Sequence, residues 1–179
     1  MLKEKEIELG FMSEEDLRIL ALTRNRNFDY FFDDTLVDPD AQTEWYQKVT
    51  SDGTRQVFGI YTKMVSGTDG PGCFAGSIGY SSLDRKNQTV EYGNLLIREA
   101  FRGKGLAKEA SKVLLDYLFT EVNVHRVYLE VFADNDNAVV LYEKLGFKRE
   151  GVLRQAVFSR GEFRDVLIMG LLREDWKHE

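Results

Sequence analysis

A basic, glycine-rich turn stands between a strand-like run and an amphipathic helix, and its residue types could do chemistry. Residues 94–107 read NLLIREAFRGKGLA. The first backbone N–H groups of a helix lack partners within the helix, and the helix dipole adds partial positive charge there. Gly103 and Gly105 let the backbone come close to a phosphate. Because Arg102 and Lys104 add positive charge, the segment predicts a site for a phosphorylated ligand.

Two common phosphate-binding patterns do not fit this turn. The dinucleotide pattern G-x-G-x-x-G/A fails because Lys108 stands where the third small residue is required. The P-loop pattern G-x-x-x-x-G-K-[ST] fails because Gly105 follows Lys104. A third ligand is the pyrophosphate of coenzyme A, and an ordinary strand-to-helix turn without a ligand stays open as the alternative.

Two motifs carry a family resemblance. Arg102, Gly105 and Ala107 match the signature R-x-x-G-x-G/A, and residues 135–147 (NDNAVVLYEKLGF) match N-x-x-A-x-x-x-Y-x-x-x-G-F. Together they resemble the GCN5-related N-acetyltransferases (GNAT), over roughly residues 5–173. The second match is carried by Asn135, Ala138, Tyr142, Gly146 and Phe147.

Two further segments look like one branch of that family. Residues 150–172 and residues 24–27 (RNRN) are similar to ribosomal-protein N-terminal acetyltransferases and related small-amine enzymes. The resemblance implies an acetyl-CoA-dependent N-acetyltransferase, in which a primary amine of a peptide or small molecule attacks the thioester directly. Enzymes that acetylate the amino group of a nucleotide-linked sugar share these features and stay open as an alternative.

Hydrophobic periodicity and capping signals predict the elements that position these motifs. Ser13 with Asp16 resembles a capping box, and Asp38 before Pro39 predicts a second helix start. Strands alternating with helices predict an α/β (α+β mixed sheet) class with helices on both faces. The resemblance implies the GNAT fold, a central twisted mixed sheet of about six to seven strands flanked by about four helices. Strands are expected at 4–9, 55–63, 73–82, 88–97, 125–132, 147–158 and 163–172, and helices at 13–22, 39–49, 106–119 and 136–145.

The resemblance also implies which residues bind the acetyl donor. Asn135 could contact the pantetheine arm or cap its helix, and both roles stay open. Backbone groups of the strand before the turn are expected to hold the pantetheine arm and the acetyl carbonyl. The residues implied are Leu95, Leu96, Ile97, Arg102, Gly103, Lys104, Gly105, Leu106, Ala107, Asn135, Ala138 and Tyr142.

The implied reaction requires a base and benefits from an acid. An alkylamine has a pKa of about 10.4, so most of it is protonated and unreactive at neutral pH. Glu91 is the candidate base, acting directly or through water, although a surface or salt-bridged glutamate would look the same in the sequence. The resemblance implies that Tyr142 protonates the departing thiolate, and the alternative is a tyrosine that only packs against the sheet.

The resemblance implies an acceptor site framed by the first two helices and the last strands. The segment 24–34 (RNRNFDYFFDD) combines basic, aromatic and acidic groups, which could instead be core aromatics and solvated charges. The residues predicted to bind the acceptor are Arg26, Phe31, Phe32 and Arg154.

Composition limits the remaining possibilities. The net charge of −6 argues against nucleic acid as a partner, and no metal-ligand spacing surrounds His125 or His178. One cysteine and no long apolar run fit a cytoplasmic protein without a membrane partner. Residues 66–72 (SGTDGPG) read as a hairpin loop, so residues 1–179 are expected to form one domain, with a homodimer possible in this family. A non-catalytic acyl-CoA sensor and an interaction protein with a degenerate site are the alternatives of other classes.

Overall fold

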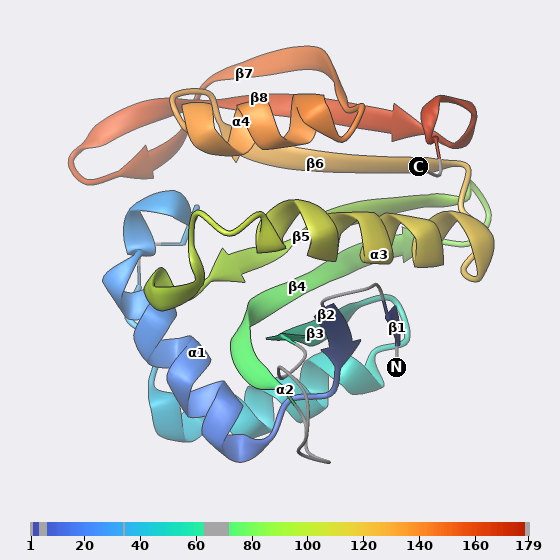
Figure 1. Ribbon diagram of the computed structural model, residues 1–179. Coiled ribbons are helices and arrows are strands. Elements are labelled where there is room, and N and C mark those ends of the chain that lie inside the picture. Colours follow the sequence, from blue (N-terminus) through green and yellow to red (C-terminus); the bar gives the residue numbers. More distant parts are fainter. Residues whose placement is uncertain (1, 4–6, 34, 63–71, 178–179) are drawn as a thin grey trace.

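A mixed sheet with helices on both faces organises residues 2–3, 7–33, 35–62 and 72–177, the part of the chain that the computed structural model describes (Figure 1). The strand order is β1-β2-β3-β4-β5-β6-β8-β7, and the predicted fold class is confirmed. The eighth strand beyond the expected range is β1, which has two residues. The strands are β1 (Leu2–Lys3), β2 (Ile7–Gly10), β3 (Gln56–Thr62), β4 (Cys73–Asp84), β5 (Thr89–Ile97), β6 (Arg126–Phe132), β7 (Lys148–Ser159) and β8 (Glu162–Leu172).

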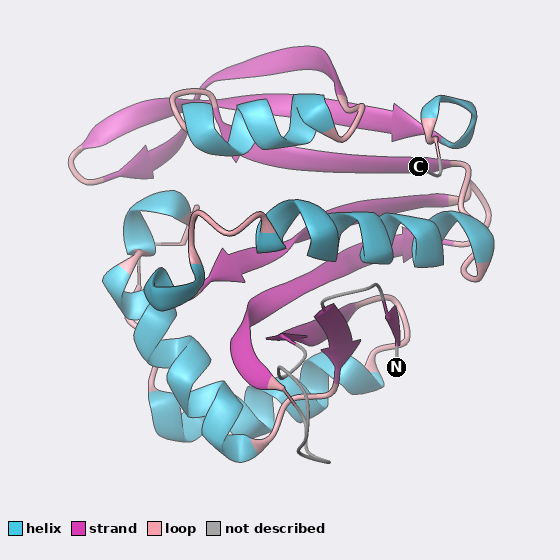
Figure 2. Ribbon diagram, in the orientation of Figure 1, coloured by secondary structure: helices cyan, strands magenta, loops and turns pink. Residues whose placement is uncertain are grey.

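Among the described residues, four α-helices and three short 3-10 helices lie between the strands, and a fourth 3-10 helix follows β8 (Figure 2). Ser13 and Asp16 form the predicted capping box at the first helix. Asp38 caps as predicted with Pro39 following, but it starts a 3-10 helix, and the α-helix begins only at Gln42. The predicted loop at 66–72 lies outside the described residues except for Gly72. The helices are α1 (Glu14–Arg26), η1 (Phe28–Tyr30), η2 (Pro39–Ala41), α2 (Gln42–Ser51), η3 (Glu99–Phe101), α3 (Leu106–Thr120), α4 (Asp136–Lys144) and η4 (Arg173–Asp175).

Two apolar clusters occupy the two faces of the sheet. Helices α3 and α4 pack into the larger cluster, which contains Leu114 and Val139, and helices α1 and α2 pack into the smaller one. Successive side chains of a strand point to opposite faces. Accordingly, Val57 of β3 lies in the smaller cluster, whereas Ile60 of the same strand lies in the larger one.

Strands β5 and β6 separate after a short parallel pairing. They pair only over Thr89–Glu91 and Arg126–Tyr128, although both strands continue beyond those residues. Figure 1 shows the two strands diverging toward their ends. The pairing of β5 with β4 shifts register between Ser77 and Gly79, where Asn94 has a φ of 55°. The sheet is therefore opened on one side of β5 and bulged on the other.

Candidate active site

A pocket of about 550 Å³ lies where β5 and β6 diverge. It is lined by parts of β5, β6, α4, the basic turn and the segment after α1. Residues predicted to bind the acetyl donor and residues predicted to bind the acceptor therefore line the same pocket. Of the predicted residues, the pocket is lined by Phe31, Phe32, Glu91, Leu95, Leu96, Ile97, Arg102, Ala107, Asn135, Ala138 and Tyr142.

The basic turn leads directly into the uncapped start of α3. Gly105 is the N-cap residue, it has a φ of 78°, and no side chain caps this helix. Gly103 has a φ of 73°, and a Cβ added at either glycine would meet nothing within 4 Å. A 15-residue helix that begins with free N–H groups beside open space can hold an anion.

The cations of the turn are folded back onto the protein. Arg102 donates from Nε to the Ile97 carbonyl at 3.1 Å and from a terminal nitrogen to Asn27 Oδ1 at 2.6 Å. Lys104 donates to the carbonyl of Ala100 at 3.1 Å. The Leu106 side chain is buried in the core, so only the backbone of this predicted residue could face a ligand.

Tyr142 projects from α4 into the core beside the pocket. Its residue is 9% exposed, and its ring packs edge-on against Tyr92, with centroids 5.7 Å apart. Burial raises the pKa of Tyr142 to about 12. The phenol is therefore protonated at neutral pH. Its ring also packs against the sheet, which is the packing role that the alternative interpretation of Tyr142 predicts.

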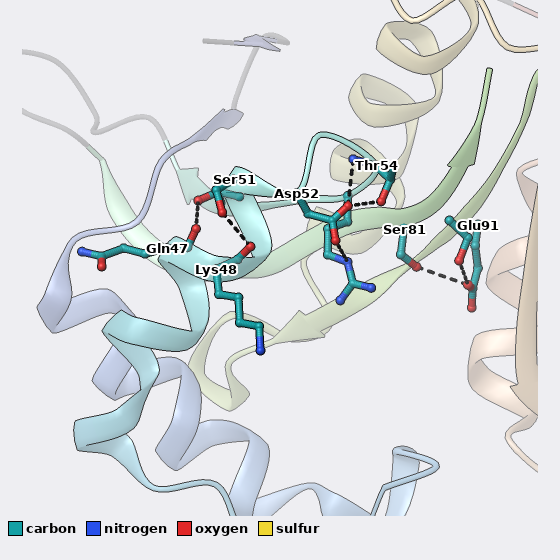
Figure 3. Close-up of polar contacts among 10 residues, drawn as sticks. Gln47, Lys48, Ser51, Asp52, Thr54, Ser81 and Glu91 are labelled. Atoms are coloured by element: carbon teal, nitrogen blue, oxygen red, sulfur yellow. Dashed lines mark hydrogen bonds and ion pairs between the residues drawn. The ribbon is translucent and has the colours of Figure 1, made fainter.

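Glu91 lies on the opposite face of β5 from Tyr92. The hydroxyls of Ser81 and Ser82 donate to the same carboxylate oxygen, Oε2, at 3.2 Å and 3.1 Å (Figure 3). Within the described residues, Glu91 has no ion pair, and its Oε1 accepts no hydrogen bond. Because alternate side chains change face, Tyr92 points to α3 and α4 while Glu91 faces away from them.

A second carboxylate, Glu130 of β6, lines the same pocket and was not predicted. The charges of both acids act on Tyr128, two residues before Glu130 on β6. Burial raises the pKa of Tyr128, and the charges of Glu91 and Glu130 raise it further. The alternation of residues 125–132 contains a signal for Glu130, because the buried Leu129 and Val131 leave it on the other face. No ion pair joins Glu130 to any part of the chain that the structure describes.

Two predicted acceptor residues do not join this pocket. Arg26, at the end of α1, lines a separate hollow with Arg98. Arg154 lies on the exposed edge strand β7, within a register shift between Leu153 and Val157. The residues that line the pocket formed by β5 and β6 therefore do not include Arg26 or Arg154, and acceptor binding by these two residues stays a prediction. Asp34, part of the predicted acceptor segment, lies outside the described residues.

Asn135 caps α4 while lining the pocket. Its Oδ1 accepts from the backbone N–H of Ala138 at 3.3 Å. The capping role is thus present, and contact with a ligand stays a prediction.

Replacing Asn135 by alanine is expected to lower the free energy of unfolding by about 1 kcal/mol, because the first turn of α4 loses its cap. Urea titration followed by circular dichroism measures the change. Asn135→Ser retains a capping oxygen and is the matched control. Equal stability of the alanine and serine variants would contradict the capping role.

The described residues contain neither a cluster of metal-ligating side chains nor a membrane-spanning helix. No group of three or more His, Cys, Asp or Glu that could hold a metal ion occurs among these residues. No helix in the described ranges is both long enough and apolar enough to cross a membrane. His178 lies outside those ranges.

Comparisons with known proteins agree on one enzyme family. The family described as "Acetyltransferase (GNAT) domain" matches residues 7–148. The spermidine N(1)-acetyltransferase of Vibrio cholerae is 30% identical over 173 residues, 96% of this chain and 95% of that protein. A crystal structure of the Vibrio cholerae spermidine N-acetyltransferase in complex with CoA and spermine superposes with a TM-score of 0.84 at 29% identity, covering 94% of this chain and 96% of that one.

Two relatives from Bacillus subtilis match over shorter lengths. The uncharacterized prophage-derived N-acetyltransferase YokL is 38% identical over 102 residues, 57% of each chain. The putative ribosomal N-acetyltransferase YdaF is 31% identical over 108 residues, 60% of this chain and 58% of that protein. The family match over residues 7–148 and the spermidine acetyltransferase relative, which aligns with 96% of this chain, lead to one conclusion. The chain belongs to the GNAT family of N-acetyltransferases.

Proposed function

We propose that this enzyme acetylates a primary amine of a small cationic molecule, with polyamines as the preferred class. The observation that carries the proposal is the pair of carboxylates, Glu91 and Glu130, lining the pocket where β5 and β6 diverge. Neither has an ion-pair partner among the described residues, so both are available to ammonium groups. The names of two relatives, spermidine acetyltransferases of Vibrio cholerae and Escherichia coli, support the same class.

The residues of the turn and of α4 fit acetyl-CoA as the donor. Backbone N–H groups at the start of α3, with Gly103 and Gly105 leaving open space, would hold its pyrophosphate. The strand residues Leu95–Ile97 and Ala138 line the path for its pantetheine arm. When bound, acetyl-CoA supplies an activated acetyl thioester.

Two side chains on opposite faces of the sheet would transfer protons, one from the amine and the other to the leaving sulfur. Glu91 accepts a proton from the ammonium group, directly or through water, since only the neutral amine is nucleophilic. Tyr142 holds its phenolic proton up to high pH, because burial raises its pKa to about 12, and can donate it to the leaving sulfur. The assignment of these roles agrees with both residues lining one pocket.

Thiol release from acetyl-CoA, followed against a panel of amines, tests the proposal. The panel contains spermidine, spermine, short diamines, monoamines, N-terminal peptides and an amino-sugar nucleotide. Polyamines are expected to give the largest kcat/KM, and the nucleotide sugar the smallest, because its phosphates oppose two carboxylates. Preference for a peptide or a nucleotide sugar would overturn the acceptor class. CoA binding in calorimetry without release from any amine would favour the non-catalytic sensor.

Replacing Glu130 by glutamine is expected to raise KM for spermidine about fivefold, because an exposed ammonium–carboxylate pair contributes up to about 1 kcal/mol. A monoamine of similar length places no second ammonium near Glu130, so its KM should not change. The difference should shrink at high salt, which screens exposed charges. Equal increases of KM for the monoamine and spermidine would contradict recognition of a second ammonium group.

A further inference from the structure

Arg164 of β8 lies between two walls of the pocket that are far apart in the sequence. Its side chain is 15% exposed. On one side lie residues 29–32, which follow α1, and on the other lie residues 132–135, which lead into α4. Tyr30, Phe32 and Asn135 from these two segments line the pocket itself.

The first set of contacts ties Arg164 to the start of α4. Its Nε and one terminal nitrogen donate to the two carboxylate oxygens of Asp134, at 3.2 Å and 2.5 Å. Asp134 directly precedes Asn135, the N-cap of the helix that carries Tyr142. A bidentate pair of this kind restricts orientation as well as distance.

The second set of contacts ties Arg164 to the segment after α1. Its other terminal nitrogen donates to the backbone carbonyl of Asp29 at 3.1 Å. The guanidinium carbon also lies 3.6 Å from the ring centroid of Phe132. That ring meets Phe32 edge-on, with centroids 4.9 Å apart. Phe32 is therefore linked to Arg164 both along the backbone and through Phe132.

We propose that Arg164 is a positioning residue that holds the aromatic wall at residues 30–32 in register with the start of α4. This proposal rests on the proposed function only in taking residues 30–32 as the wall of the pocket that faces the acceptor amine. No other residue type could make all these contacts, because only arginine offers a planar fork of donors together with a face that stacks on a ring. Lysine would keep the charge and lose the simultaneous contacts.

Arg160 offers a matched control because it contacts the residues that lead into the aromatic wall. It pairs with Asp29 Oδ2 at 3.0 Å and lies over the Phe28 ring at 5.4 Å. Its side chain is 55% exposed, and none of its contacts among the described residues reaches α4. Arg160→Gln thus loosens one wall without releasing the other.

The experiment compares Arg164→Gln, Arg164→Lys and Arg160→Gln in the full chain. Hydrogen–deuterium exchange reports the two walls without needing any acceptor, and calorimetry reports CoA binding. Arg164→Gln should speed exchange in both residues 28–33 and residues 134–138, whereas Arg160→Gln should affect only the first. With spermidine, Arg164→Gln should lower kcat/KM by roughly tenfold to a hundredfold, because small misplacements of reacting groups cost that much. The dissociation constant of CoA should rise by much less than kcat/KM falls, since the turn at 102–107 is untouched and only the start of α4, beside the pantetheine path, is loosened.

Three results would overturn the proposal that Arg164 holds the two walls in register. Faster exchange confined to β7 and β8, or kcat/KM within about twofold of the parent, would overturn the proposal. So would a CoA affinity that falls in proportion to kcat/KM, because the effect would then lie on the donor side. If Arg164→Gln does not fold, Arg164→Lys carries the same comparison, with an intermediate loss expected. If the parent acetylates no amine in the panel, the acceptor class fails, while the exchange data still decide whether Arg164 couples the walls.

Discussion

Tyr142→Phe is expected to lower kcat by about 10²–10⁴-fold, the usual contribution of a general acid. The substitution removes one hydroxyl from a ring that is 9% exposed, and the ring contacts with Tyr92 and Phe147 can persist. CoA affinity should therefore be retained. The loss should appear in kcat and in kcat/KM alike, since the proton is needed only as the thioester breaks.

The pH dependence of kcat in the parent enzyme tests the role of Tyr142 independently. A general acid works while it is protonated, so activity falls as pH rises through its pKa. Because burial raises the pKa of Tyr142 to about 12, this residue should cause no fall in kcat between neutral pH and about pH 10. An alkaline decline centred near pH 8 would assign the acid role to another group.

Tyr92→Phe is the matched control for the Tyr142 variant. Tyr92 is also buried, with 2% of its surface exposed, and its hydroxyl forms a 2.7 Å hydrogen bond with the hydroxyl of Ser111. Ser111 also donates to the Ala107 carbonyl, so it retains a partner in this variant. The control should keep kcat within about threefold of the parent. Unchanged kcat in Tyr142→Phe would remove that residue from the reaction.

The donor half of the site is predictable because its residues are close in the sequence. The turn 102–107 and the start of α4 each form within one strand-to-helix connection, so residue types and spacing are enough. The fold is predictable for a similar reason, since periodicity and the capping box at Ser13 mark the main elements. The two-residue strand β1 has no periodicity to detect.

The acceptor half is less predictable because contacts between distant residues build it. Arg164 bonds Asp29 across 135 positions of sequence, and no local pattern signals that contact. Arg154 lies in a register shift of β7, and one shifted residue reverses the face to which later side chains point. Glu130 follows from alternation only once the partner strands of β6 are known, because either face of a strand can be the one that lines a pocket.

Glu91→Gln is expected to lower kcat/KM for the amine by about 10²-fold or more, the loss typical of a general base. Glutamine has nearly the same shape, and its carbonyl oxygen can still accept from Ser81 and Ser82. The variant therefore removes the charge and the basic oxygen while preserving the local hydrogen bonds. CoA affinity should not change, because Glu91 lies on the face of β5 away from α3 and α4.

The split of this loss between kcat and KM separates a base from a residue that only attracts the amine, and its dependence on pH supports the distinction. An alkylamine with a pKa of about 10.4 becomes increasingly neutral as pH rises toward 10 and then needs less help in losing its proton. The loss should therefore appear in kcat, and the ratio of parent to Glu91→Gln kcat should fall steadily from pH 7 to about pH 10. Glu130→Gln, which removes a carboxylate with no assigned proton transfer, should raise KM for spermidine and leave kcat unchanged at each pH. A loss confined to KM in Glu91→Gln would leave Glu91 as a binding group and assign the proton transfer to a water chain.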